Sequence, residues 1–161
     1  MARIEARLEE MGLTLPEPMR LPPGMELPFA WVRVRGARAY VSGHGPLHSD
    51  GSLRGPFGKV GDEVTPEEGY EAAKGAALSV LSSLKRELGD LDRVTAWLVV
   101  NGFVNAAPDF GETAGVVNGF SDLILDLYGP EAGTHARTAP GVATLPLNHA
   151  VFVSAELEIT G

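Results

Sequence analysis

The segment Thr65–Gly89, TPEEGYEAAKGAALSVLSSLKRELG, carries the clearest structural signal in the chain. Thr65 and Glu68 have the spacing of a capping box, in which each side chain bonds the backbone N–H of the other residue, and Pro66 suits the first helical position. Gly89 is a typical helix stop. The apolar residues between these signals repeat at helical spacing: Tyr70, Ala73, Ala77, Val80, Leu81, Leu84 and Leu88. The segment therefore predicts an amphipathic helix that packs on a core.

The segments on either side of this helix predict strands and a second helix. Residues 94–104 are apolar and partly β-branched, which is typical of a buried strand. Asp109–Glu112 offers a second capping box, and Gly129-Pro130 is expected to end the helix that follows it. Alternating or small-residue runs predict strands at residues 29–35, 38–42, 137–145 and 150–159. This order predicts an α+β domain, a mixed β-sheet with two helices packed on one face.

The face of the predicted sheet opposite the helices also needs an explanation. In the last strand, Phe152 points to that face together with Ser154, Glu156 and Glu158. An aromatic ring beside charged residues indicates that solvent does not cover the whole face. A second subunit packed on it is the simplest explanation.

Length, charge and cysteine content limit the function classes. The chain has 161 residues, typical of one domain, and we expect a short helix and Pro-rich arm over residues 1–28 followed by a single domain over 29–161. Thirteen Lys and Arg against twenty-one Asp and Glu give a net charge of −8, which argues against nucleic-acid binding. The absence of cysteine excludes disulfides and thiolate chemistry. The charged first residues and short apolar runs lead us to expect a cytoplasmic protein without a membrane segment.

Common cofactor, metal and nucleophile motifs do not fit this sequence. Its glycines match neither a P-loop nor a dinucleotide-binding turn. His44 and His48 are four residues apart, but the glycines and proline around them disfavour the helix that would place both rings on one face. Ser121 lacks the glycine context of a nucleophile elbow, and His135 and His149 have no partners by spacing. We therefore expect no cofactor and no metal site.

Arg137 is the most unusual charged residue. It lies in the neutral, small-residue segment 135–146, HARTAPGVATLP. A guanidinium matches a carboxylate bidentately, so Arg137 is a candidate anchor for a small organic acid. The alternative is a structural ion pair with one of the twenty-one acidic residues, and physical argument alone slightly favours that pair.

Several short motifs identify a family resemblance. They are Tyr40-Val41-Ser42-Gly43, Gly58-Lys59-Val60-Gly61, Phe103-Val104-Asn105, Asp109-Phe110, Val117-Asn118, Val142-Ala143 and Leu145-Pro146, together with Arg137. In this order, from about Phe29 to Ile159, the chain resembles the YjgF/RidA family, also called reactive intermediate imine deaminases or endoribonuclease L-PSP-like proteins. The longer N-terminal arm and the motif His-Ala-Arg-Thr-Ala at residues 135–139 are typical of a divergent subgroup.

The resemblance implies a chorismate-mutase-like fold and a homotrimer with a ligand cleft between subunits. In the archetypal deaminases the arginine at the position of Arg137 binds the substrate carboxylate. The resemblance likewise implies that Ser42 and Gly43 line the cleft and that Asn118 shapes it.

Four positions in the expected cleft depart from the family pattern. Phe152 stands where the family has a glutamate proposed to position the hydrolytic water, and a phenyl ring cannot accept a proton. Phe29 replaces a tyrosine, Ala139 a cysteine, and His44 a glutamine. His44 is a candidate substitute base, because imidazole titrates near neutral pH.

The resemblance thus implies a protein that binds small carboxylate or imine metabolites, and two hypotheses about its chemistry stay open. One is hydrolysis of amino-acid imines or enamines to 2-oxo acids and ammonia, as by a 2-iminobutanoate/2-iminopropanoate deaminase. The other is a non-catalytic metabolite-binding trimer, which the substitution at Phe152 favours. Ribonuclease or translation-inhibitor activity is a third hypothesis, and the net charge of −8 disfavours it.

Overall fold

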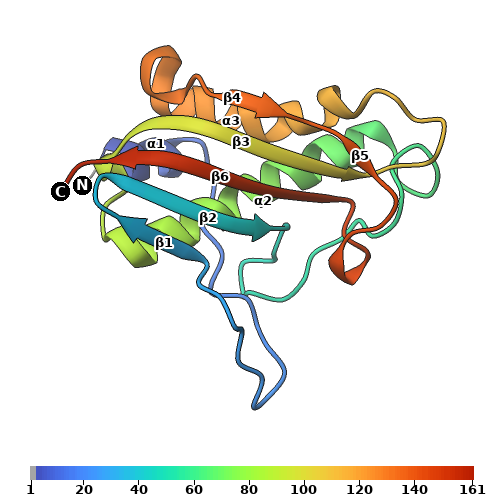
Figure 1. The fold of residues 1–161 in the computed structure, drawn as a ribbon, viewed down its shortest axis with the longest axis horizontal. Coiled ribbons are helices and arrows are strands. Elements are labelled where there is room, and N and C mark those ends of the chain that lie inside the picture. The colour runs from blue at the N-terminus through green and yellow to red at the C-terminus, as the bar shows by residue number, and fades with distance from the viewer. Residues whose placement is uncertain (1–2) are drawn as a thin grey trace.

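The computed structural model describes residues 3–161 and shows helices packed against one sheet (Figure 1). The helices are α1 (Arg3–Glu10), α2 (Pro66–Leu88) and α3 (Thr113–Gly133), with 3-10 turns η1 (Leu91–Arg93) and η2 (Pro146–Asn148). The strands are β1 (Val32–Arg35), β2 (Arg38–His44), β3 (Val94–Asn105), β4 (Ala136–Thr138), β5 (Gly141–Val142) and β6 (Val151–Ile159). The order of strands and helices follows the prediction.

The sheet is mixed and has β6 at its centre. Its strand order is β1-β2-β6-β3-β4, and β5 also pairs with β3. β6 runs antiparallel to β2 and β3, whereas β4 and β5 run parallel to β3. β4 and β2 therefore lie on opposite sides of the β3–β6 pair, which separates the residues that these two strands carry.

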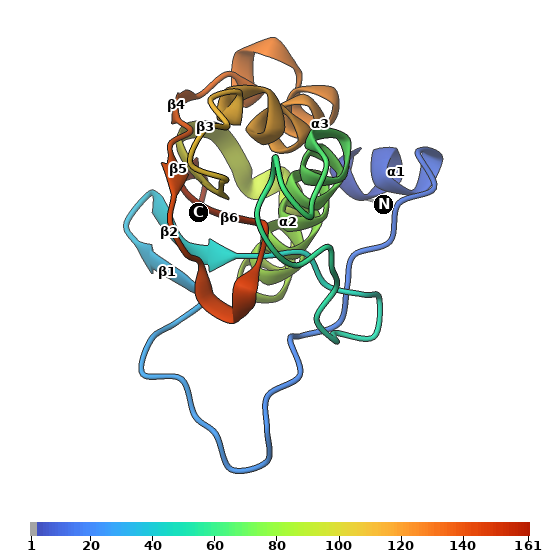
Figure 2. The same ribbon diagram turned by 90° about the vertical axis from the view of Figure 1, so that its right-hand side faces the viewer.

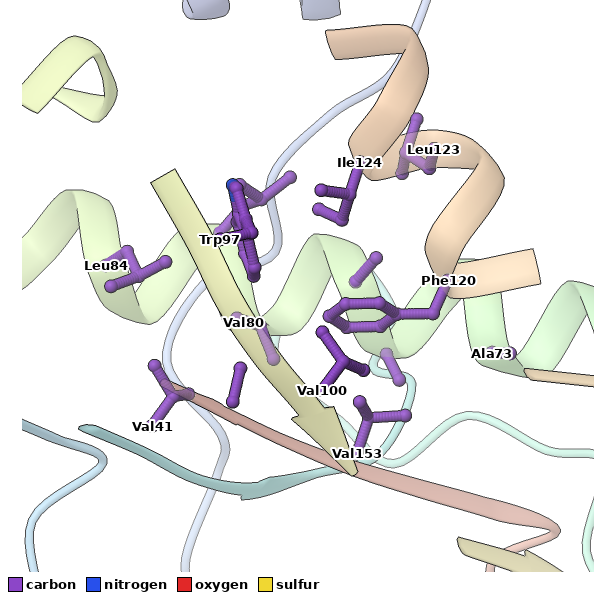
Figure 3. Close-up of a cluster of buried hydrophobic side chains, with 14 of the residues drawn as sticks. Val41, Ala73, Val80, Leu84, Trp97, Val100, Phe120, Leu123, Ile124 and Val153 are labelled. Carbon is purple, nitrogen blue, oxygen red and sulfur yellow. The ribbon is translucent and has the colours of Figure 1, made fainter. Parts of the chain in front are cut away.

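The long helices cover one face of the sheet, as predicted (Figure 2). α2 and α3 pack on each other and on the strands, and the apolar core fills the space between the two layers. Figure 3 shows Trp97 and Val100 of β3 in one apolar cluster with α3 side chains such as Phe120 and Ile124. The rings of Trp97 and Phe120 meet edge to face, with centroids 6.0 Å apart.

Local signals in α2 act as the sequence predicts, and small residues let it approach α3 closely. Both bonds of the Thr65–Glu68 capping box are present, and Gly89 ends the helix with a left-handed φ of 82°. In α3, a Cβ built on Gly119 would lie 2.0 Å from the carbonyl oxygen of Tyr70. Only a glycine fits where the backbones come this close.

Three local predictions are wrong. Glu112 precedes α3 without a side-chain capping bond, so the second capping box is absent. Gly129-Pro130 does not end α3: Gly129 has φ 79°, and Pro130 starts a further turn because proline suits a first helical position. The strand expected over residues 137–145 is split into β4 and β5, since Pro140 has no N–H to donate and only its carbonyl bonds β3, at Val104.

The N-terminal segment folds onto the domain from Arg3 onward; Met1 and Ala2 of the expected 1–28 arm lie outside the described residues. Ile4 and Leu8 of α1 are buried in the common core. After α1 the chain runs as an extended arm that loops away from the body before β1 (Figure 1). Backbone bonds from Glu17 to Ser49 and from Arg20 to Gly51 hold this arm in place.

The opposite face of the sheet has no helix over it among residues 3–161 (Figure 2). It carries exposed polar residues and Tyr40, which is 40% exposed. That a second subunit covers this face stays a prediction. No helix in the described part of the chain is long and apolar enough to span a membrane.

Candidate functional site

Arg137 lies on the edge strand β4 and turns toward α3. It pairs in register with Val100 of β3, whose side chain is fully buried under the helices. The guanidinium Nη1 donates to Asn118 Oδ1 at 2.8 Å and to Ser121 Oγ at 3.1 Å, and Nη2 donates to the Ala114 carbonyl at 3.2 Å. The structure therefore brings together Arg137 and Asn118, as the family resemblance implies.

The positive charge of Arg137 has no acidic partner in the structure. The ion pairs formed within residues 3–161 are Arg20–Asp50 and Lys85–Glu5. The Nε–H of Arg137 and one N–H of its Nη2 bond no acceptor in the same part of the chain. The ion pair between Arg137 and an acidic residue, which the sequence slightly favours, is thus not formed within residues 3–161. Three neutral acceptors fix the guanidinium and leave donors for a ligand.

The pocket beside Arg137 contains an unpredicted serine–histidine pair. The pocket has a volume of about 210 Å³ and is lined by Asn118, Ser121, Leu125, Thr134, His135 and Arg137. His135 Nδ1 lies 2.7 Å from the Gly133 carbonyl oxygen, and His135 Nε2 lies 2.8 Å from Ser121 Oγ. A carbonyl only accepts, so Nδ1 carries the proton and Nε2 accepts from the serine hydroxyl. No spacing rule reveals this pair, because Ser121 is on α3 and His135 follows it in the connection to β4.

Ser42, Gly43, His44, Phe29 and Phe152 form a second cluster, at the end of β2. A Cβ built on Gly43 would lie 2.8 Å from the Phe152 ring, so the absent side chain makes room for that ring. Ser42 Oγ donates to the Ala30 carbonyl at 2.7 Å. The exposed Phe29 packs edge to face on Trp31, with centroids 5.4 Å apart. Gly43, His44 and Phe152 also line a largely enclosed cavity of about 60 Å³.

His44 is buried and bonded through both ring nitrogens. Nδ1 donates to the Ser42 carbonyl at 2.6 Å, and Nε2 accepts from Ser83 Oγ at 2.8 Å. Ser83 Oγ also accepts from Arg86 Nη2 at 3.1 Å. Burial lowers the pKa of His44 to about 4, and the nearby Arg86 charge acts in the same direction. His44 is therefore neutral at physiological pH, and its Nε2 lone pair already accepts the hydrogen bond from Ser83.

His149 adds an unsatisfied group to this second cluster. Its ring lies between those of Phe57 and Phe152, at centroid distances of 5.9 and 5.3 Å, and the residue is 2% exposed. Its Nδ1 is buried without a hydrogen-bond partner in the described residues, and burial lowers the pKa of the ring.

The two clusters do not meet within one chain. Between β4, which carries Arg137, and β2, which carries Gly43 and His44, lie β3 and β6. Since neighbouring strands are about 4.8 Å apart, the separation is about 14 Å. Ala139 lies between β4 and β5, half-buried against the core on the Arg137 side. The residues that the resemblance assigns to one cleft thus occupy two places on the chain.

Comparison with known proteins shows relatives over nearly the whole chain. A family model described as "YjgF/chorismate_mutase-like, putative endoribonuclease" matches residues 5–158. Protein TCP17 of Trypanosoma cruzi is 40% identical over 157 residues, which cover 98% of this chain and 94% of that protein.

Two solved structures share the fold at substantial identity. The crystal structure of Atu1372 from Agrobacterium tumefaciens, described as a protein of unknown function, has a TM-score of 0.85 at 37% identity and covers 98% of this chain and 92% of its own. A structure from Shewanella oneidensis described as "a putative endoribonuclease" has a TM-score of 0.83 at 30% identity. The match covers 97% of this chain and 99% of that chain. The matches confirm the chorismate-mutase-like fold that the motifs imply.

Proposed function

Because the chain belongs to the YjgF/chorismate mutase-like family, we propose that it binds a small 2-oxo or 2-imino acid through Arg137. One observation carries the proposal: the guanidinium is fixed by three neutral acceptors, has no carboxylate partner in residues 3–161, and keeps N–H groups free on Nε and Nη2. A carboxylate accepts two parallel N–H bonds from such a fork, and these charge-assisted bonds are short and strong.

A neighbouring copy supplies the other half of the binding cleft. By strand spacing within one chain, Gly43 on β2 lies about 14 Å from the Arg137 strand and Phe152 on β6 lies about 10 Å from it. This separation supports a cleft in which residues of two subunits combine. The uncovered sheet face offers a surface for that contact. Both observations support the homotrimer implied by the family resemblance, in which each cleft lies between two subunits.

Hydrolysis of amino-acid imines or enamines is the reaction that we assign to this cleft. Water adds to the C=N carbon, and a 2-oxo acid and ammonia leave, while Arg137 holds the carboxylate and Asn118 keeps the guanidinium oriented. A non-catalytic metabolite-binding trimer is the second candidate, and Phe152 favours it because a phenyl ring cannot activate water. RNA cleavage fits least, because the net charge of −8 opposes a phosphate backbone.

Titration calorimetry with 2-oxobutyrate tests the binding step. The wild-type protein is expected to bind one molecule per chain, and Arg137→Ala is expected to abolish detectable binding. Arg20→Ala is the matched control, because that exposed arginine side chain bonds only Asp50, through an ion pair and a hydrogen bond from Nε to the backbone carbonyl. Absence of binding, or equal binding by Arg137→Ala, would refute the proposal. A measurement of ammonia release from freshly generated 2-aminoacrylate then distinguishes imine hydrolysis from non-catalytic metabolite binding.

A further inference from the structure

The largely enclosed cavity beside His44 is built from several separate parts of the chain. The arm after α1, the end of β2 with the loop that follows it, the second half of α2 and the turn η2 all contribute to its wall. The apolar side chains of the wall are Met19, Trp31, Leu47, Leu53, Leu147 and Phe152. Small-molecule sites are typically apolar with a few polar groups that orient the ligand. The polar groups of this cavity therefore indicate what it binds.

Arg86 supplies a positive charge at this cavity. Its Nη1 donates to Ser82 Oγ at 2.6 Å and its Nη2 to Ser83 Oγ at 3.1 Å, both one turn earlier on α2. Arg86 is exposed and forms no ion pair within residues 3–161. Its Nε–H and one N–H on each terminal nitrogen bond no acceptor in the same part of the chain. Neutral hydroxyls thus fix this guanidinium and leave donors for a carboxylate.

Glu17 is the acidic residue in the wall of the cavity. It belongs to the arm, and its charge acts on that of Arg86 without an ion pair in residues 3–161. The arm is held here by two bonds: Ser82 Oγ donates to the Pro16 carbonyl at 2.5 Å, and the Glu17 N–H donates to the Ser49 carbonyl at 2.9 Å. A bound anion would meet attraction from Arg86 and a weaker repulsion from Glu17, so the two residues should affect its affinity in opposite directions.

His149 places an unpaired polar atom in the same wall. The residue is 2% exposed, and its Nδ1 has no hydrogen-bond partner in the described residues. If Nδ1 carries the proton it needs an acceptor, and if it carries the lone pair it needs a donor. A hydroxyl group can donate or accept, so it satisfies either tautomer. An unpaired buried atom is costly, which favours a ligand with such a group.

The turn η2 holds an apolar side chain at the edge of the cavity by an unusual backbone conformation. Leu147 and Asn148 both have φ 58°, a left-handed conformation that is uncommon outside glycine. The Asn148 carbonyl accepts from the Gly58 N–H at 2.9 Å, which helps to fix the turn. Leu147 lines the cavity and is still 57% exposed. Backbone strain of this kind is concentrated at ligand sites.

We infer that this cavity binds a short hydroxycarboxylic acid, with the carboxylate on Arg86 and the hydroxyl toward His149. The volume of about 60 Å³ admits about four water-sized groups. Outside its carboxylate, 3-hydroxybutyrate has three carbons and one hydroxyl oxygen, which match that room. Apolar walls then surround the carbons, and the two polar ends of the ligand meet the two polar groups that have free bonding capacity.

This site is separate from the Arg137 anchor and does not rest on the proposed function. β6 and β3 lie between β2, at the cavity, and β4, which carries Arg137. Only Gly43 and Phe152 of the cavity wall belong to the expected cleft between subunits. The charged anchor is a different one, Arg86 on α2.

The test is a titration with 3-hydroxybutyrate followed through the indole N–H signals in ¹H–¹⁵N NMR spectra. The chain has two tryptophans: Trp31 lines the cavity, and Trp97 lies in the core at 1% exposure. The Trp31 signal is expected to shift saturably while the Trp97 signal stays in place. The same shift is expected in Arg137→Ala, because the ligand does not use that anchor.

Variants of the polar groups should change the affinity in different directions. Arg86→Gln should raise the Kd about tenfold or more, because charge-assisted bonds are lost. Glu17→Gln should lower the Kd about two- to fivefold, because it removes a repulsion. Wild type should prefer 3-hydroxybutyrate to butyrate about threefold or more, and His149→Phe should abolish that preference. Arg35→Gln, at an exposed residue of β1, is the matched control, and thermal unfolding confirms that each variant is folded.

The outcomes separate this site from the proposed function. An unmoved Trp31 signal, or equal affinity in wild type and Arg86→Gln, overturns the inference. Equal wild-type affinity for butyrate and 3-hydroxybutyrate overturns the hydroxy-acid assignment. A shift that disappears in Arg137→Ala places the ligand at Arg137, which overturns this site and supports the proposed function. A protein that binds 3-hydroxybutyrate through Arg86 but does not bind 2-oxobutyrate confirms this site and refutes the proposed function.

Discussion

Replacing His44 should remove a pH dependence of stability that the structure assigns to this residue. His44 has its pKa lowered from 6.5 to about 4, first because burial disfavours its charged form and also because Arg86 lies nearby. In the unfolded chain the His44 ring therefore binds a proton below about pH 6.5, whereas in the folded chain it binds one only below about pH 4. Unfolding takes up a proton in this window, so the free energy of unfolding falls as the pH is lowered from about 6.5 to about 4.

The size of the effect follows from the pKa shift. One pKa unit corresponds to about 1.4 kcal/mol, so lowering the pH from 7 to 4.5 costs the folded state about 2–3 kcal/mol through His44 alone. His149 contributes in the same direction, because burial lowers its pKa too, and carboxylates also titrate in this window. The measured quantity is therefore a difference between wild type and His44→Gln, in which the other groups cancel.

Urea unfolding followed by circular dichroism at pH 7 and pH 4.5 provides the assay. His44→Gln lowers stability at both pH values, but its loss between them should be about 2–3 kcal/mol smaller than that of wild type. His48→Gln, an exposed matched substitution, should behave as wild type. Equal pH dependence in wild type and His44→Gln would refute the assignment, and it would return His44 to the candidates for a base that works near neutral pH.

Two further predictions concern the helix contact and the anchor. Gly119→Ala should lower the free energy of unfolding by about 1–3 kcal/mol or more, because its Cβ would lie 2.0 Å from the Tyr70 carbonyl oxygen. Gly115→Ala in the same helix meets nothing within 4 Å and should raise stability by about 0.5–1 kcal/mol, so thermal unfolding of the pair separates the close approach from helix propensity. Arg137→Lys keeps the charge but loses the planar fork, so the Kd for 2-oxobutyrate should rise about tenfold or more, and an unchanged Kd would contradict bidentate binding.

The sequence predicts the elements of this fold where one signal is strong and local. The Thr65–Glu68 capping box and Gly89 define α2, and the alternation of residues 151–159 defines β6. Gly129-Pro130 misleads because a glycine with positive φ ends one helical segment while the proline after it starts another turn. Ala139-Pro140 breaks a strand that the run of small residues suggests is continuous.

The candidate site is only partly visible in the sequence. Arg137 and Asn118 stand out by family resemblance, and the structure joins them at 2.8 Å. The link from Ser121 to His135 depends on how the connection after α3 returns to the sheet edge, which no spacing rule describes. The absence of an acid beside Arg137 in residues 3–161 is likewise a property of the folded chain, because twenty-one acidic residues were available for an ion pair.

A crystal structure of the protein with 2-oxobutyrate tests the central claim most directly. The account predicts the ligand carboxylate on the Nε and Nη2 side of Arg137, within hydrogen-bond distance of both nitrogens, while Nη1 keeps its bonds to Asn118 and Ser121. A ligand bound away from this guanidinium, or an Arg137 side chain paired with an acidic residue of a neighbouring copy and closed to the ligand, would contradict it.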